Sequence, residues 1–255
     1  MKVMTMAIMA LSFVTISCTN VKKSTDTTVT VEQQVCFLKH FSHISENDCD
    51  LIITIDQPVN GPKSLVDSIN CFLNEQLYLY FDHEEEKHFP YGDVFSSDIP
   101  NLAEHYRKTY SAYFDVDNSY TCEFGSHCLE LNMVAQTSKY VTYESVSVFY
   151  GEGLEESRIW VTFAKSDGHK LKDVITTMGM FEFIQTHPEL RNSDVWDDIL
   201  QKSEGGEPLI LNNAGLLNDS LVFEYTWCNG VFEDYPFDLK AVKPFLSHEA
   251  QELID

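Results

Sequence analysis

The sequence predicts an α+β fold in which antiparallel sheets carry helices packed on one face. One observation favours this class, and a second indicates that the chain forms a globular core. Strand-like and helix-like segments occur in separate runs along the chain, whereas a parallel sheet needs them to alternate regularly. The 255 residues are 44% hydrophobic and 13% aromatic, which is enough to bury a substantial core.

The first 17 residues have the features of a lipoprotein signal peptide. Lys2 supplies a short positive region, and residues 3–16 carry no charge and are largely apolar. This stretch is too short for a transmembrane helix, which needs about 20 apolar residues. It ends in T-I-S-C, with a small residue directly before Cys18. We expect cleavage before Cys18 and lipidation of its thiol. The alternatives are a signal peptide cleaved nearby that leaves a free thiol, and an apolar start that folds inside.

Residues 18–30 are expected to form a flexible tether, because the sequence after Cys18 is polar, rich in threonine and offers almost nothing to bury. Later apolar runs, such as 51–55, have the length of strands. The lipid is therefore the only membrane anchor expected. The residues after Cys18 lack an immediate acidic cluster, which favours an outer-membrane anchor in the bacterial envelope, with the protein facing the periplasm.

Residues 31–128 form the first of two expected parts. Candidate strands at 34–41 and 49–56 precede a Pro- and Gly-containing break at 58–62. Ser64 is a good N-cap for the helix that follows. Its apolar residues recur at three- and four-residue steps and define one face: Leu65, Ile69, Phe72, Leu73, Leu77 and Tyr80.

A second helix is expected at 99–114, with Pro100 in its first turn. Its predicted apolar face consists of Leu102, Tyr106, Tyr110 and Phe114.

Residues 129–255 form the second expected part, where the period changes from helical to alternating. Leu129, Leu131, Met133 and Ala135 alternate with more polar residues and predict a half-buried strand. Further strands at 140–150 and 156–163 suggest an antiparallel meander. The remaining expected elements are a helix start at 170–175, helices at 179–185 and 194–202, strands at 209–211 and 220–227, a helix at 238–246 and a last turn at 248–253.

Besides Cys18 the chain has six cysteines, an even number that permits disulfides in an exported protein. Cys122 and Cys128 flank a Gly-containing bend between strand-like segments and are the most local candidate pair. Two buried thiols are the alternative. The sequence leaves the connectivity of the others open: Cys36, Cys49, Cys71 and Cys228. Zinc-finger spacing is absent, and we expect no metal site.

The net charge of −23 limits the classes of partner. Removing residues 1–17 takes away one lysine, so the mature chain is one charge more negative. Such a surface repels nucleic acid and anionic headgroups, while it attracts cationic proteins or divalent metals. The simpler interpretation is that the charge keeps the protein soluble.

Enzyme motifs are not recognisable. The sequence has no G-x-S-x-G elbow, P-loop or G-x-G-x-x-G run. The segment H-E-A-Q-E at 248–252 lacks the second histidine of a zincin helix. The acidic and histidine-containing run at 82–88 offers ligands for a divalent cation, but a solvated charge run is the favoured interpretation. We expect no cofactor, and carboxylate pairs suited to glycan chemistry cannot be selected from 40 acidic residues.

Four runs in the second part resemble a known family: S-V-S-V-F-Y-G-E-G-L (145–154), R-I-W-V-T-F (158–163), D-G-H-K-L-K-D-V-I (167–175) and Y-P-F-D-L-K-A-V-K-P-F-L-S (235–247). Their order and spacing are similar to the DUF3298 family, the RsiV-like extracytoplasmic domain of lysozyme-sensing anti-sigma factors. The region before residue 129 resembles the DUF4163-like domain that accompanies it. The resemblance assigns motif turns to Gly151, Gly153, Asp167, Gly168 and Asp173.

The resemblance implies a two-part architecture and a non-enzymatic protein that binds or senses a cationic, lysozyme-like protein or a cell-wall ligand. The family's turn histidine is absent here, because the turn at 151–154 reads G-E-G-L. The alternative function is a cell-wall or glycan-processing enzyme, or an accessory to a deacetylase, because domains like the first part also accompany deacetylase modules.

Overall fold

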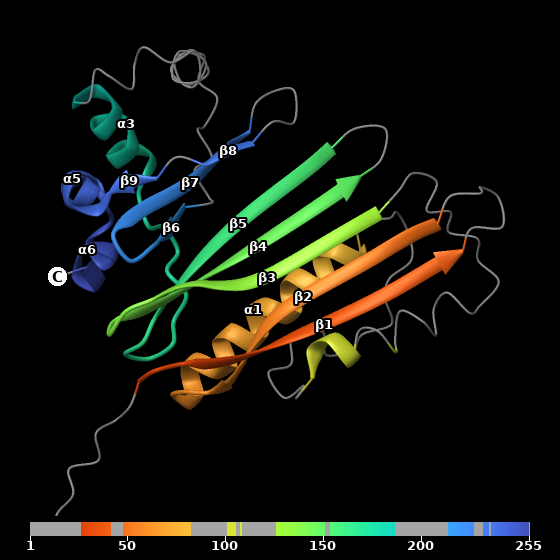
Figure 1. Cartoon of the computed structure of the whole chain (residues 1–255). Helices are drawn as coiled ribbons and strands as arrows, with labels where there is room; N and C mark the ends of the chain where they lie inside the picture. Colours follow the sequence, from red (N-terminus) through yellow and green to blue (C-terminus); the bar gives the residue numbers. More distant parts are fainter. Residues whose placement is uncertain are drawn as a thin grey trace, which may run out of the picture.

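A computed structural model of the chain describes residues 27–41, 48–82, 101–105, 108, 126–150, 154–186, 214–226, 232–234 and 236–254. The described chain forms two sheets and several helices (Figure 1), which confirms the predicted α+β class. The larger sheet has five strands in the order β1-β2-β3-β4-β5. Their bounds are β1 Thr30–Phe41, β2 Asp48–Asn60, β3 Ser126–Gln136, β4 Tyr140–Tyr150 and β5 Leu154–Ala164.

The sheet is mixed, whereas the sequence predicted antiparallel pairing. β2 and β3 run parallel, with Ile53 opposite Leu129 and Ile55 opposite Leu131. A parallel pair requires a crossover between its strands, and the helix α1 (Lys63–Asp82) lies in that connection. Residues 128 and 129, at the expected division between the two parts, are adjacent residues of β3. The two parts therefore share one continuous sheet.

The predicted apolar face of α1 is confirmed for Leu65, Ile69, Phe72, Leu73 and Leu77, all buried against the larger sheet. The Phe72 and Phe163 rings meet edge to face at 5.9 Å. Burying one such side chain contributes about 1.5–3 kcal/mol. The side chain of Tyr80 lies outside the described residues.

Two boundaries near this core differ from expectation. Helix α1 begins at Lys63, where the Val66 N–H donates to the Pro62 carbonyl at 3.0 Å, so Ser64 lies inside the first turn. Val29, expected in the tether, is buried and belongs to the fold.

Part of the second predicted helix is described. Residues 102–105 are helical, and Leu102 is buried. Its backbone N–H donates to Gln57 Oε1 at 3.2 Å. Pro100 and the other predicted apolar residues of this helix lie outside the described residues.

The antiparallel meander predicted for the second part is confirmed by the pairing of β3 with β4 and of β4 with β5. The face of β4 and β5 that points away from α1 meets a second sheet. This sheet has the order β6-β7-β8, with β9 also paired to β7. The bounds are β6 Ala214–Leu216, β7 Ser220–Thr226, β8 Phe232–Asp234 and β9 Phe237–Asp238.

A ring of hydrogen bonds joins the two sheets. Thr142 Oγ1 donates to the Leu216 carbonyl at 2.6 Å, and the Leu216 N–H donates to Thr162 Oγ1 at 3.2 Å. Thr142 has one hydroxyl proton, so the 2.9 Å contact between the two hydroxyls requires Thr162 to be its donor. Beside this ring Gly215 lies so close to Trp160 that a Cβ at position 215 would be 2.5 Å from Trp160 Cβ.

The helices of the second part are α3 (Thr177–Thr186), α5 (Leu239–Val242) and α6 (His248–Ile254). With the second sheet they enclose a separate apolar core that includes Phe183, Leu221 and Val242. The expected helix at 179–185 is thus confirmed, whereas the turn expected at 248–253 is a helix. The expected elements at 194–202 and 209–211 lie outside the described residues.

One further expectation for this part is wrong. Residues 170–175 do not start a helix: the Leu171 N–H donates to the Thr162 carbonyl at 2.9 Å, and Lys170 and Ile175 form isolated bridges to Phe163 and Leu246. Hydrogen bonding to β5 thus takes the place of helical hydrogen bonds in this segment.

The helix expected at 238–246 is present at these residues, but it is divided into two types. It becomes α5 and a 3-10 turn, Lys243–Phe245. Pro244 has no N–H to continue α-helical bonding, so the chain changes its helix type there.

Among the described helices, none has the length and apolar character needed to cross a membrane.

Candidate functional site at the α6 junction

Helix α6 is fixed to the body of the domain by polar contacts at its first residues. Ser247 caps the helix, because its Oγ accepts from the Ala250 N–H at 3.2 Å. The same Oγ donates to the Asp173 carbonyl at 2.7 Å, and the Ser247 N–H donates to the Val174 carbonyl at 3.0 Å. Ala250, a residue of α6, is fully buried. The start of α6 is therefore held in register with residues 173 and 174.

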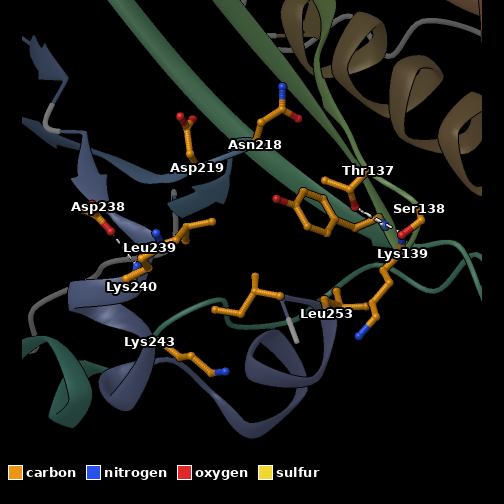
Figure 2. Close-up of a pocket in the computed structure, with 12 residues that line it drawn as sticks. Thr137, Ser138, Lys139, Asn218, Asp219, Asp238, Leu239, Lys240, Lys243 and Leu253 are labelled. Carbon is orange, nitrogen blue, oxygen red and sulfur yellow. Dashed lines mark hydrogen bonds between the residues drawn. The ribbon is translucent and has the colours of Figure 1, made fainter.

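A hollow of about 590 Å³ opens beside the other end of α6 (Figure 2). Five segments of the chain supply its walls: the β3–β4 turn, the β6–β7 turn, the β9–α5 junction, the 3-10 turn after α5 and the C-terminal end of α6. The lining residues are Thr137, Ser138, Lys139, Tyr140, Asn218, Asp219, Asp238, Leu239, Lys240, Lys243, Leu253 and Ile254.

The floor of the hollow is apolar and firmly built. Tyr140 and Leu239 are both buried. The Tyr140 hydroxyl donates to the Leu217 carbonyl at 2.6 Å. Burial, and secondarily the negative charge of Asp219, raises the pKa of Tyr140 to about 12. Tyr140 therefore stays protonated at neutral pH and acts as a hydrogen-bond donor.

The rim of the hollow carries both signs of charge. Asn218 and Asp219 lie on one side, and Lys139 and Lys243 lie across the hollow from them (Figure 2). Lys139 Nζ donates to the Glu252 carbonyl at 2.9 Å, which fixes this lysine against α6. Asp238 is the N-cap of α5, because its Oδ1 accepts from the Lys240 N–H at 2.7 Å.

The turn after β5 holds α6 from another side through His169. His169 Nδ1 lies 2.5 Å from Asp167 Oδ1, and His169 Nε2 contacts Glu249 Oε1 of α6. The Asp167 hydrogen bond raises the pKa of His169; burial opposes this rise and Glu249 adds to it. The same hydrogen bond lowers the pKa of Asp167. We call these three side chains the histidine latch.

Gly168 explains how this turn fits against the first part of the chain. Its φ of +83° lies in the left-handed region. A Cβ at this position would be 2.6 Å from the carbonyl carbon of Ser64 and 2.7 Å from Leu65 Cα. Only glycine therefore allows the turn to approach the start of α1 so closely.

The structure brings together three of the residues that the family resemblance singled out. Asp167 and Gly168 form the turn of the histidine latch, and the Asp173 carbonyl accepts from Ser247 Oγ. Gly168 lets the turn pack against α1. Asp167, through His169, and Asp173, through Ser247, connect this part of the chain to α6. Gly151, Gly153 and Cys18 lie outside the described residues.

Cys128 is half-buried on β3, where its Sγ lies 3.8 Å from Glu130 Oε1. Burial and then the Glu130 charge raise the pKa of its thiol. Cys122 lies outside the described residues, so the disulfide between the two cysteines stays a prediction.

Sequence reasoning missed the hollow and the histidine latch. The latch joins residues 80 positions apart, His169 and Glu249. The only local signal was the D-G-H turn, because an aspartate two residues before a histidine can accept from both its backbone and its ring. Within the described ranges, no group of three or more histidine, cysteine, aspartate or glutamate side chains is arranged to hold a metal ion.

The fold defines the class of protein first: an α+β domain with a five-stranded mixed sheet, one long crossover helix and a second sheet packed on the meander. It is similar to the crystal structure of a DUF3298 family protein from Bacteroides fragilis, with a TM-score of 0.54 and 15% sequence identity over 90% of this chain and 99% of that chain. The predicted resemblance to DUF3298 proteins is thereby confirmed at the level of the fold.

A DUF3298 family protein from Pseudomonas aeruginosa aligns with a TM-score of 0.46 and 9% identity over 86% of this chain and 96% of that chain. No protein-family model matches the sequence, and no curated protein matches it significantly.

Proposed function

We propose that this chain is a lipid-anchored protein of the bacterial envelope that binds a cationic, lysozyme-like protein and does not transform it. The observation that carries the proposal is the net charge of −23, with 40 acidic against 17 basic residues. An anionic domain on a membrane tether attracts basic proteins of the cell wall space and steers their approach.

The geometry of the hollow supports binding in preference to catalysis. Its best-placed hydroxyl, on Tyr140, donates to a carbonyl and has a raised pKa. Lys139 and Asp238 are engaged in holding α6 and α5. These groups stabilise the walls of a site, whereas general acid–base chemistry uses groups with a pKa near the working pH.

The location is part of the same proposal. The signal-like residues 1–17, Cys18 and the polar segment after it support an anchor in the outer membrane with the domain facing the periplasm. Replacing Cys18→Ala should move the protein from the membrane fraction to the soluble fraction, or block its processing. A normally processed, membrane-bound Cys18→Ala protein would refute the lipid anchor.

Partner binding is tested with the soluble chain of residues 19–255 and a lysozyme-like protein. The association rate should fall steeply between 0.1 M and 1 M salt, because the screening length contracts from about 10 Å to about 3 Å. An unrelated basic protein of similar size is the control. Equal affinity for that control would show that the interaction is non-specific charge attraction. No binding to either protein would refute the proposed partner class.

A further inference from the structure

We propose that the face of the larger sheet opposite α1, over strands β1 to β3, is the surface on which the cationic protein partner docks. This inference rests on the proposed function and deepens it, because it assigns the partner a surface of named residues. We call this surface the open sheet face. It consists of Val35, Ile52, Thr54, Cys128, Glu130 and Asn132.

The alternation of side chains along the strands defines this face. Ile53 of β2 and Leu129 of β3 are buried against α1. Successive side chains of a strand point to opposite faces, so the even-numbered residues of 52–54 and 128–132 point away from the helix. Thr54 lies opposite Val35 on one side and opposite Glu130 on the other. These three residues therefore form one row across three strands.

This side of the sheet is covered over two strands and exposed over the others. The second sheet packs on β4 and β5, where Trp160 and Thr142 are buried beneath it (Figure 1). Over β1 and β2, in contrast, Val35 is 64% exposed and Ile52 is 37% exposed. The two are diagonal neighbours across the strand pair. A single exposed apolar residue is ordinary, whereas adjacent ones offer apolar contact area to a partner.

The charge of these strands suits a cationic partner. Together β1, β2 and β3 carry five carboxylates and one lysine. Glu130 is exposed in the row described above. Its Oε2 accepts from Asn132 Nδ2 at 3.2 Å, and Cys128 Sγ lies 3.8 Å from its Oε1. Neighbours on the same strand thus orient this carboxylate, so that pairing with a lysine or arginine costs less side-chain entropy.

Two other described carboxylates on this side of the sheet are engaged within the fold. Asp56 Oδ2 accepts from the Met133 N–H at 3.1 Å. Glu144 Oε1 lies 3.7 Å from Arg158 Nη1. Glu130 therefore supplies the main ionic contact of the open sheet face, and the exposed apolar pair lies beside it. An apolar contact next to a charged group is the usual composition of a protein interface.

The test measures the binding kinetics of lysozyme to the soluble chain of residues 19–255 by surface plasmon resonance at low salt. Glu130→Lys should weaken binding at least about tenfold and reduce the salt dependence of the association rate, because a like charge then faces the basic groups of the partner. The double variant Val35→Thr with Ile52→Thr keeps β-branched side chains and removes apolar contact. It should raise the dissociation rate and leave the association rate nearly unchanged.

Matched controls carry the same chemical changes elsewhere. Glu182→Lys reverses the charge of an exposed residue of α3, and Val59→Thr changes an exposed apolar residue at the far end of β2. Both controls should bind lysozyme as the wild type does. Thermal melts followed by circular dichroism establish that every variant is folded.

The outcomes separate this surface from the proposed function. No binding of lysozyme to the wild-type chain would refute the proposed function and the surface with it. Lysozyme that binds the wild type and both open-face variants equally would overturn the surface alone. The surface would also be overturned if Glu182→Lys weakened binding as much as Glu130→Lys, because binding would then follow net charge and not position.

Discussion

Replacing Glu249→Gln should weaken the histidine latch in a manner that depends on pH. The change removes the α6 carboxylate from His169 Nε2 while keeping the size of the side chain. His169 has a pKa raised above its ordinary value of 6.5. A group whose pKa is raised on folding stabilises the folded state. This contribution is complete at pH values below the pKa in the unfolded state, and it is lost as the pH rises through the pKa in the folded state. The wild type and variant should therefore differ most near pH 6 and converge by pH 9.

The expected magnitude is small because the pair is exposed. The side chains of His169 and Glu249 are 41% and 45% exposed. Exposed ion pairs contribute about 0.2–1 kcal/mol, and we expect a loss of about 0.5 kcal/mol at pH 6. For a domain of this size that corresponds to a Tm lower by roughly 1–2 °C.

Differential scanning calorimetry at pH 6 and pH 9, in low salt, measures the difference directly. Glu182→Gln on α3 is the matched control, since it also neutralises an exposed carboxylate but lies outside the latch. An NMR titration of the His169 ring should give a pKa above 6.5 in the wild type and a lower one in the variant. A Tm difference that is equal at both pH values, or that the control reproduces, would refute this reasoning.

Two further substitutions and one disulfide measurement test other parts of the structure. Gly168→Ala should cost more than about 2 kcal/mol in unfolding free energy, because the left-handed backbone costs about 1–2 kcal/mol for other residues and the new Cβ meets the α1 backbone; a variant as stable as wild type in urea melts would contradict the close approach. Leu73→Ala should lower stability by about 2–5 kcal/mol, because the side chain is fully buried between α1 and the sheet, and a loss below 1 kcal/mol would argue against this packing. Cys122 and Cys128 should form a disulfide in chain produced in an oxidising compartment; peptide mapping without reduction decides this, and free alkylation of both thiols would exclude it.

The elements that could be predicted from the sequence are those whose signal is local. Leu65, Ile69 and Leu73 recur at four-residue steps, so the helix and its buried face follow from spacing alone. The meander followed in the same way from the alternation around Leu129 and Leu131.

Other features depend on residues that meet only after folding. The parallel pairing of Ile53 with Leu129 reflects a crossover of more than 60 residues, which local periodicity does not encode. The segment after Gly168 has a helix-like sequence, yet the N–H of Leu171 donates to the carbonyl of Thr162 on β5. The hollow could not be predicted from the sequence for the same reason, because its lining residues Lys139 and Asp219 are 80 positions apart.

The attachment of Val29 determines how far the domain stands from its anchor. The Val29 N–H donates to Gln136 Oε1 at 2.7 Å, and Gln136 Nε2 donates to the Val29 carbonyl at 3.1 Å. With Cys18 lipidated as proposed, the segment between Cys18 and Val29 reaches at most about 40 Å when fully extended. Gln136 directly precedes Thr137, the first lining residue of the hollow, so the tether joins the domain beside the hollow. With Cys18 lipidated as proposed, the mouth of the hollow would therefore stay within about the reach of this tether from the lipid surface.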